Sequence, residues 1–159
     1  MTTTKVYARP ADLKRVRFAG GFWGRRQEVN RTRTLPAQYA KLVETNRIHA
    51  LDPAWRPGDR EARHIFWDSD VAKWLEAAAL SLTNHPLDPE LAAHMEETAD
   101  LFIRLQGADG YINSWFQNVE PEGRWTNLRD RHELYCAGHL MEAAVAHHRV
   151  TGDDRLLLA

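Results

Sequence analysis

The chain has 159 residues, enough for one domain with a hydrophobic core, and 43% of its residues are hydrophobic while 27% are charged. This composition excludes a disordered chain as the default interpretation. The formal net charge is −1, so charge gives no reason to expect a nucleic-acid partner. The sequence shows neither the apolar core of a signal peptide nor an apolar run of membrane-spanning length. We therefore expect no membrane partner and a cytoplasmic location.

The first part of the chain predicts an arm, one long helix and an irregular stretch. Residues 1–20 mix polar, basic and apolar residues and indicate an extended arm or short strand that ends at a pair of glycines. A helix is predicted over Arg25–Thr45, kinked or restarted near Pro36, because proline cannot continue the backbone hydrogen bonding of a helix. From Asn46 to Ile65, prolines, a glycine and alternating charges predict a loop.

Two helices and a second loop are predicted next. Apolar residues at helical spacing predict a helix whose first turn is capped by Asp68 or Ser69. Asp88, followed by a proline, is a strong start signal for another helix, which is expected to end at Gln106. Residues 108–130 contain turn-forming residues and several aromatic residues, and we predict that they form a loop.

The last long helix is predicted over Arg131–Val150, with Asp130 as its N-cap. One face of it carries polar and aromatic side chains at spacings of three and four, namely His132, Tyr135, Cys136, His139 and Glu142. This polar stripe predicts a face that lines a cavity, and the small apolar second half predicts a helix surrounded by neighbours. Two histidines and a cysteine have ligand-like spacing, but a polar cavity wall explains the same pattern, so no metal ligand is predicted.

The two alanine-rich helices indicate an internal repeat. Glu76-Ala77-Ala78 matches Glu142-Ala143-Ala144, and the same offset pairs Asp88 with Asp154. Each unit would be an apolar inner helix, a cap signal and a more amphipathic outer helix. The sequence therefore predicts an all-α fold of helix-pair repeats. By this alignment residues 155–159 begin another outer helix, and we expect the chain to be an N-terminal piece of a longer protein.

Four stretches carry a resemblance to a known family: GGFWGRRQ, FWDSDVAKWLEAAALSL, LQGADGYINSWF and RWTNLRDRHELYCAGHLMEAAVAHHRVTGDDRLL. From about Phe18 to its last residue, the chain resembles the N-terminal part of the beta-L-arabinofuranosidase-like glycoside hydrolases, glycoside hydrolase family 127. The resemblance implies an (alpha/alpha)6 barrel followed by beta-sandwich domains. We accordingly expect residues 1–20 to be an arm and residues 21–159 to be a truncated N-terminal portion of the barrel.

The catalytic machinery that the resemblance implies lies beyond this chain. The best-known members of the family use a cysteine nucleophile bound to zinc and a glutamate as general acid/base, and the motifs for these residues come after the point where this chain ends. No catalytic residue is therefore predicted here, and zinc is expected only in the full-length enzyme. Cys136 is outside the nucleophile's motif, and as the single cysteine it excludes an intrachain disulfide. Glu133 is expected to pair with an arginine such as Arg129.

Five residues are predicted to contact a carbohydrate substrate. His132 begins a histidine-glutamate-aromatic motif that resembles a sugar-contacting position of the family, and Trp67, Asp68 and Asp70 are a weaker group at the start of the other inner helix. Trp125 is included because an indole can cover the apolar face of a sugar ring. Each residue has a structural alternative: the histidine as a helix-start contact, the aspartates as helix caps, and the loop tryptophan as an anchor.

Two functions from different classes remain open. The first is a glycoside hydrolase segment that acts on terminal L-arabinofuranosyl or related sugar residues of glycans. The second is a non-catalytic helical-array module for carbohydrate binding or protein interaction. The isolated chain is expected to be inactive, because it holds no complete nucleophile and acid/base set, and to self-associate through the exposed edges of the barrel segment.

Overall fold

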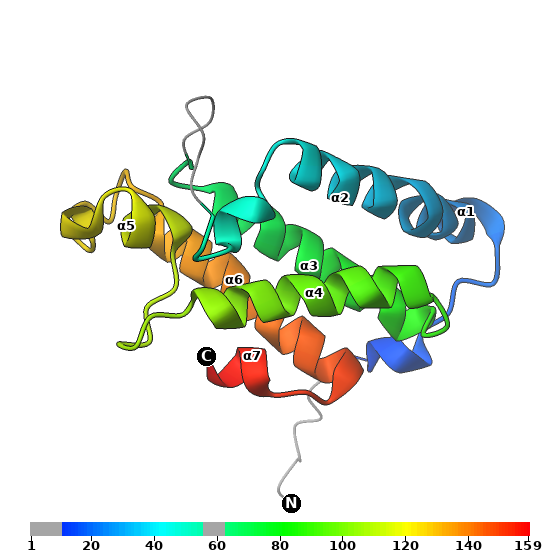
Figure 1. Ribbon diagram of the computed structural model, residues 1–159. Helices are drawn as coiled ribbons and strands as arrows, with labels where there is room; N and C mark the ends of the chain where they lie inside the picture. Colours follow the sequence, from blue (N-terminus) through cyan, green and yellow to red (C-terminus); the bar gives the residue numbers. More distant parts are fainter. Residues whose placement is uncertain (1–10, 56–62) are drawn as a thin grey trace, which may run out of the picture.

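A computed structural model describes residues 11–55 and 63–159, and within these ranges every regular element is a helix (Figure 1). Most of the predicted arm lies outside the described residues. Its last ten residues contain a short 3-10 helix, Leu13–Arg15, whose first turn is capped by the Asp12 carboxylate, and no strand is found in this stretch. None of the described helices combines the length and hydrophobicity that crossing a bilayer requires.

The predicted first helix is present but begins earlier and is interrupted. Helix α1 spans Gly21–Val29, a π-helical turn spans Asn30–Thr34, and α2 spans Leu35–Glu44. The wider π turn comes directly before Pro36, with the Leu35 amide donating to the carbonyl oxygen five residues back. A proline ring clashes with the carbonyl of the preceding helical turn, and widening that turn relieves the clash. The predicted restart at the proline is therefore confirmed.

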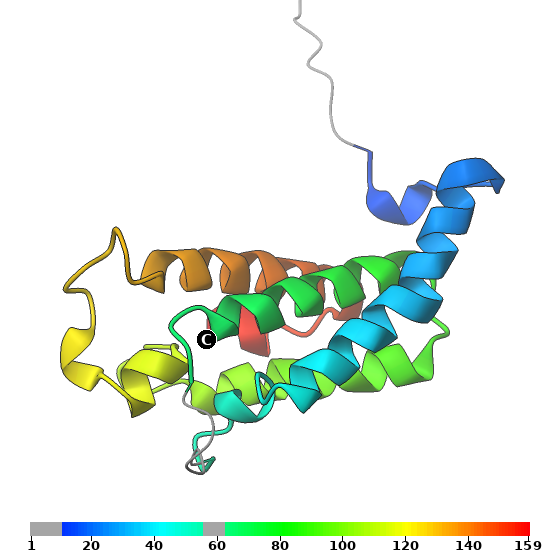
Figure 2. The ribbon, with the colours of Figure 1, turned by 90° about the horizontal axis from the view of Figure 1, so that it is seen from above.

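Five helices build two layers. Helices α3 (Trp67–Asn84) and α6 (Glu133–Thr151) lie side by side and run in the same direction (Figures 1 and 2). Helices α4 (Pro89–Leu105) and α7 (Arg155–Leu158) contact each other and run the opposite way, in the same layer as α2. We call α3 and α6 the inner helices and α2, α4 and α7 the outer helices. This alternation confirms the predicted helix-pair repeat and the all-α fold class.

The hydrophobic core fills the space between the two layers. Trp74 is buried on α3, and its indole N–H donates to the carbonyl oxygen of Leu35 at 3.0 Å, which fixes α2 against the inner layer. Next to this indole, Tyr39 of α2 stacks on His94 of α4 with ring centroids 3.9 Å apart. The largest fully buried apolar side chains come from four α-helices and the 3-10 helix His49–Leu51. They are Phe102, Phe116, Leu35, Leu51, Leu75, Met95 and Val71.

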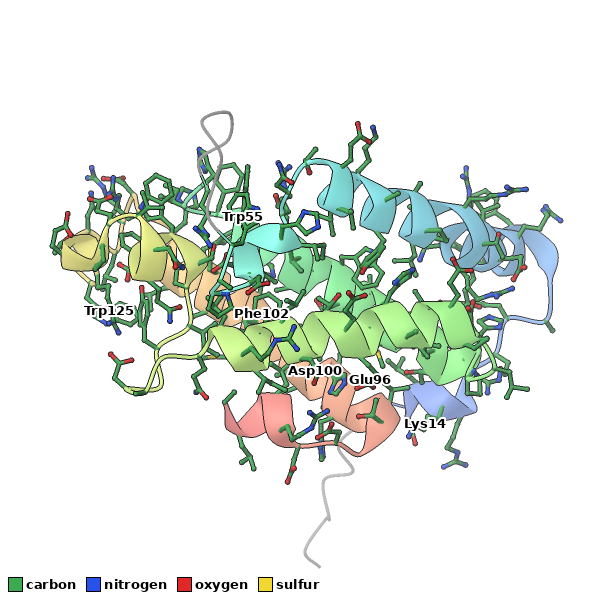
Figure 3. All side chains as sticks on the ribbon, in the orientation of Figure 1. Lys14, Trp55, Glu96, Asp100, Phe102 and Trp125 are labelled. Carbon is green, nitrogen blue, oxygen red and sulfur yellow. The ribbon has the colours of Figure 1, made fainter. Side chains whose placement is uncertain are left out.

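Ion pairs tie α4 to the second repeat unit. Glu96 and Asp100 of α4 both face α6 and α7 (Figure 3). Glu96 lies 3.2 Å from the buried imidazole of His147 on α6, and Asp100 accepts from the guanidinium of Arg155 on α7 at 2.9 Å. The last helix is therefore held in the outer layer even though it has little more than one turn.

The predicted helix starts are partly wrong. Asp88 caps α4 as predicted, accepting from the Leu91 amide at 3.2 Å. Helix α3 instead follows Phe66, which makes no side-chain cap, so neither aspartate nor serine in its first turn serves as the N-cap. Asp130 also does not cap α6: the N-cap residue is His132, in the left-handed conformation with φ 59°. The Asp130 side chain cannot cap α6, because the helix begins three residues later and the left-handed His132 lies between them.

Both predicted loops contain short helical turns. A 3-10 helix, His49–Leu51, lies in the first loop, of which residues 56–62 are outside the described ranges. The second loop contains α5 (Ser114–Asn118) and a 3-10 helix, Pro121–Gly123. The sequence missed α5 although Asn113 caps it by accepting from an amide of its first turn at 3.0 Å. An element of five residues is too short to show helical periodicity.

The second half of α6 is surrounded on one side only. Ala143, Ala144 and Ala146 are buried, but Met141 is 67% exposed and Val145 is 36% exposed. The expectation that neighbours surround this half of the helix is therefore wrong for the described residues. The repeat explains the difference, because α6 has an inner neighbour on one side where a continuous array supplies two.

Candidate functional site

Because the inner helices are parallel, both begin at the same end of the molecule. There the imidazole of His132 lies 5.9 Å from the ring of Phe66, measured between centroids, and the thiol of Cys136 donates to the carbonyl oxygen of Ile65 at 3.5 Å. The two helix starts frame a shallow cleft of about 590 Å³. Its lining comes from α3, α6 and the segment before α6: Phe66, Ser69, Asp70, Lys73, Leu128, Arg129, His132 and Tyr135.

Asp70 and Trp67 share one arginine at the side of this cleft. The Nε of Arg47 donates to an Asp70 carboxylate oxygen at 3.0 Å, and its guanidinium lies over the Trp67 indole with its Cζ 5.0 Å from the ring centroid. Asp70 reaches the cleft with its charge balanced, and Trp67 is half-buried beside it rather than in the lining. Of the predicted substrate contacts, the cleft thus brings together His132 and Asp70.

Asp68 lies below the cleft and holds the following loop. Its side chain is buried, and its two carboxylate oxygens accept from the amide nitrogen of Ser114, at 2.6 Å, and from the Ser114 hydroxyl. Burial raises the pKa of Asp68, while both bonds from the serine act to lower it. Both oxygens already have partners within the protein, so this carboxylate positions the start of α5. Its predicted contact with substrate stays a prediction.

Glu133 holds the same segment from the other inner helix. It is only 2% exposed, and its carboxylate accepts from the Tyr111 hydroxyl and, at 2.8 Å, from the Trp125 amide. Burial and this carboxylate together raise the pKa of Tyr111, because both oppose formation of a phenolate. Arg129 forms its ion pair with the neighbouring Asp130 at 3.0 Å, so the expected pairing of Glu133 with this arginine is wrong.

Two predicted substrate residues adopt left-handed backbone conformations. His132 and Trp125 have φ values of 59° and 60°, a region that costs an ordinary residue roughly 1–2 kcal/mol. At His132 the start of α6 holds the backbone in this conformation. At Trp125 the hydrogen bond from its amide to the Glu133 carboxylate holds it. Neither conformation could be predicted from the sequence, since left-handed residues are usually glycine or asparagine.

Trp125 does not lie in the cleft that contains His132. It is exposed on the loop before α6 (Figure 3), and its ring meets Tyr111 edge-on with centroids 5.3 Å apart. It lines a second groove of about 780 Å³ that runs along the free flank of α6 to α7 and includes Met141 and Leu157. Its predicted role as a sugar contact therefore belongs to a different surface from that of the histidine.

The polar stripe predicted on α6 is divided among three environments. Tyr135 lines the cleft, but Cys136 is buried, and burial raises the pKa of its thiol to about 12. His139 lies farther along, with its Nδ1 3.3 Å from a carboxylate oxygen of Glu142. Within residues 11–55 and 63–159 no three His, Cys, Asp or Glu side chains come together as metal ligands, so the described part of the chain does not fit a zinc ion.

Lys73 and Phe66 line the cleft but were not predicted from the sequence. Lys73 belongs to α3 and faces Tyr135 across the inner layer, with its Nζ 2.6 Å from the tyrosine hydroxyl. Phe66, Ser69, Asp70 and Lys73 follow one another at spacings of three and four, which is the signal for one helix face. The same criterion that revealed the stripe on α6 would have revealed this one.

Comparison with known proteins gives a consistent set of relatives. A family model described as the catalytic domain of beta-L-arabinofuranosidase, GH127, matches residues 15–159. The non-reducing end beta-L-arabinofuranosidase of Bifidobacterium longum subsp. longum is 46% identical over 97 residues, which are 58% of this chain and 15% of that protein.

Two solved structures extend the likeness to the fold. A GH127 beta-L-arabinofuranosidase from Geobacillus stearothermophilus T6 is 43% identical with a TM-score of 0.79, over 86% of this chain and 23% of that chain. A GH127 beta-arabinofuranosidase, BT3674, is 30% identical with a TM-score of 0.81, over 93% of this chain and 25% of that chain. The chain spans a quarter or less of the length of these three relatives.

Proposed function

This chain belongs to the family of GH127 beta-L-arabinofuranosidase catalytic domains, and from that membership we propose that it supplies part of the sugar-binding wall of an enzyme that removes terminal L-arabinofuranosyl or related residues from glycans. Its two-layered helices form part of the (alpha/alpha)6 barrel of the family, as predicted. The observation that carries the proposal is the cleft where both inner helices begin, because His132 and Asp70 meet there.

The cleft groups suit a sugar better than a large apolar ligand. The His132 imidazole and the Asp70 carboxylate offer a donor or acceptor each, and the Phe66 ring offers an apolar wall. A pocket with a few convergent polar groups and one aromatic face is typical of small polar ligands. We assign His132 the direct contact and Asp70, fixed by Arg47, a second one.

The bond-breaking groups are proposed to come from outside this chain. Glycoside hydrolysis requires an acid/base and a nucleophile on opposite sides of the scissile bond. Asp68 and Glu133, the two buried carboxylates at the cleft end, are both occupied by loop contacts. The thiol of Cys136 keeps its proton at neutral pH, which disfavours it as a nucleophile. A zinc ion would serve to activate the family's cysteine nucleophile, with ligands from other residues.

The first experiment measures hydrolysis of an aryl β-L-arabinofuranoside by the gene product that carries this chain, at its natural length, and by the 159-residue chain alone. We expect turnover by the former and none by the latter. Absence of turnover by the natural-length protein, together with sugar binding at the cleft, would favour the non-catalytic binding module. Turnover by the 159-residue chain would refute the assignment of catalysis to residues outside it.

The second experiment tests the histidine with a variant that does not threaten folding. His132→Gly removes the imidazole and also relieves the left-handed strain at φ 59°, so the protein should be as stable as the original or more stable by up to about 1 kcal/mol. We expect kcat/KM to fall by roughly 10- to 100-fold, as for the loss of a hydrogen bond in a binding site. Unchanged kcat/KM in a stable variant would remove His132 from the site.

A further inference from the structure

The cleft contains a side-chain pair that bridges the two inner helices. Lys73 of α3 donates from Nζ to the hydroxyl oxygen of Tyr135 on α6 at 2.6 Å, and the same nitrogen lies 4.6 Å from the centroid of the tyrosine ring. Tyr135 is 46% exposed, and its ring meets those of His132 and His139 edge-on, with centroids 5.8 and 4.6 Å away. The pair therefore stands in the cleft next to the predicted sugar contact.

Charge balance distinguishes this lysine from the other charged groups of the cleft. Asp70 is paired with Arg47, and Arg129 is paired with Asp130. No ion pair formed by the described residues includes Lys73. The cleft thus presents one ammonium group whose protein partner is a neutral hydroxyl rather than a carboxylate.

The hydrogen-bonding capacity of the pair is only partly used. An ammonium group has three donors, and Lys73 directs one of them to Tyr135. The tyrosine oxygen accepts that bond, so its own proton is free to donate to another acceptor. Side by side, the two groups offer up to three donors within a few ångströms. Adjacent hydroxyl oxygens on a sugar ring are acceptors for such donors.

We propose that Lys73 and Tyr135 form a hydroxyl-recognition pair that fixes the orientation of the sugar in the cleft. The inference rests on the function proposed above and adds two binding residues to it. Tyr135 holds the ammonium beside its hydroxyl and over its ring, and Lys73 sets the direction of the phenolic proton. Neither residue takes part in bond cleavage, and both act as specificity-determining contacts.

A purely structural role would have a different consequence. A cation–π contact and a single hydrogen bond from a lysine ammonium group contribute little to folding at exposed positions, so removing this pair should hardly change stability. A role in recognition predicts instead a loss that depends on the hydroxyl groups of the substrate. Substrates that lack one hydroxyl each separate these two possibilities.

The test uses the natural-length gene product with an aryl β-L-arabinofuranoside and its 2-, 3- and 5-deoxy analogues. Lys73→Met should lower kcat/KM on the parent sugar by roughly 10- to 100-fold, and Tyr135→Phe by roughly 3- to 10-fold. One deoxy analogue lacks the hydroxyl that the pair binds, and the unmodified protein should already hydrolyse it with a lowered kcat/KM. Lys73→Met should lower kcat/KM on that analogue little further. Thermal melting of both variants should stay close to that of the original protein.

Lys14→Met is the control, because Lys14 is an exposed lysine of the 3-10 helix Leu13–Arg15 and lines neither the cleft nor the neighbouring groove that contains Asp70 and Lys73. It should leave kcat/KM unchanged. Normal kinetics in both Lys73→Met and Tyr135→Phe would overturn the inference, and so would an equal loss on every analogue. If the unmodified protein hydrolyses no arabinofuranoside, the proposed function fails, and the assignment of the pair to sugar recognition fails with it.

A final arm distinguishes a hydroxyl from a carboxylate as the group that Lys73 binds. L-Arabinonate and L-arabinose are compared as competitive inhibitors of the unmodified protein and of Lys73→Met. We expect similar inhibition by both compounds in the unmodified protein. Much stronger inhibition by the acid, abolished in Lys73→Met, would show recognition of an anion and overturn the assignment to a hydroxyl.

Discussion

At the scale of single residues, the two buried carboxylates at the cleft end have a structural role. Asp68 and Glu133 lie in the first turns of α3 and α6, and each follows a residue predicted to contact sugar. Each carboxylate accepts from one amide and one hydroxyl of residues 107–132. The structural role of Glu133 was predicted from the sequence, but its binding partners were not. Its partners, Tyr111 and Trp125, are distant in sequence, and no local spacing rule links residues across a loop of that length.

Removal of this carboxylate should be costly. Glu133→Ala leaves the Tyr111 hydroxyl and the Trp125 amide without their acceptor, and we expect a loss of about 2–4 kcal/mol in the free energy of unfolding. Urea denaturation measures this loss. The control is Glu142→Ala on the same helix, whose exposed side chain should contribute less than about 0.5 kcal/mol. Equal effects of the two substitutions would contradict the anchoring role.

The buried thiol gives a prediction about pH. Burial raises the pKa of Cys136 to about 12, so the thiolate, which is the reactive form, is scarce at neutral pH and increases only as the pH approaches that value. Iodoacetamide at pH 8 should label the folded chain at least about a hundredfold more slowly than a free cysteine. Labelling followed by mass spectrometry measures the rate. Labelling as fast as that of the urea-unfolded chain would contradict the burial of this group.

At the scale of elements, the repeat could be predicted because short local sequence patterns recur at a constant offset. The alanine-rich helices and the aspartates before the outer helices, Asp88 and Asp154, fall at corresponding positions, and α3 with α4 and α6 with α7 occupy matching places in the two layers. The start of α6 could not be predicted in the same way. Its first turn depends on the left-handed backbone at His132, which tertiary contacts impose against the local preference of the residue.

The two units of the repeat differ in their caps, and this difference can be measured. Asp88 accepts from the Leu91 amide and from the guanidinium of Arg31, at 2.8 Å in the latter case. Its counterpart Asp154 makes no side-chain cap, because Asp153 accepts from the first amide of α7 instead. Asp88→Ala should therefore destabilise the chain by about 1–2 kcal/mol, whereas Asp154→Ala should be nearly neutral.

Thermal or urea unfolding of the two alanine variants is the appropriate measurement. Asp153→Ala completes the set, and we expect a smaller loss from it than from Asp88→Ala, since α7 is only four residues long. If Asp154→Ala cost as much as Asp88→Ala, the cap of α7 would be misassigned.

At the scale of the whole molecule, the free flank of α6 and α7 exposes large apolar side chains. Met141 and Leu158 are 67% and 77% exposed, and the groove between the two helices has a volume of about 780 Å³. Apolar patches of this kind promote association. We therefore predict that the 159-residue chain self-associates in a concentration-dependent way, which light scattering across a dilution series detects.

Substitution on this flank should reverse the association. Met141→Lys places a charge in the middle of the flank and is expected to shift the chain toward the monomer without loss of helicity. Leu87→Lys is the control: Leu87 is 95% exposed in the turn between α3 and α4, away from the flank. A dilution series that shows only monomer before any substitution would contradict the prediction.

The parallel course of α3 and α6 also has an electrostatic consequence. Each helix has an effective charge of roughly +0.5 at its amino end, and both of these ends lie at the cleft. An antiparallel pair would cancel its dipoles, whereas two parallel helices reinforce the field at their shared end. The two amino ends therefore contribute a positive potential at the cleft, and this contribution favours electron-rich oxygen atoms over cationic groups.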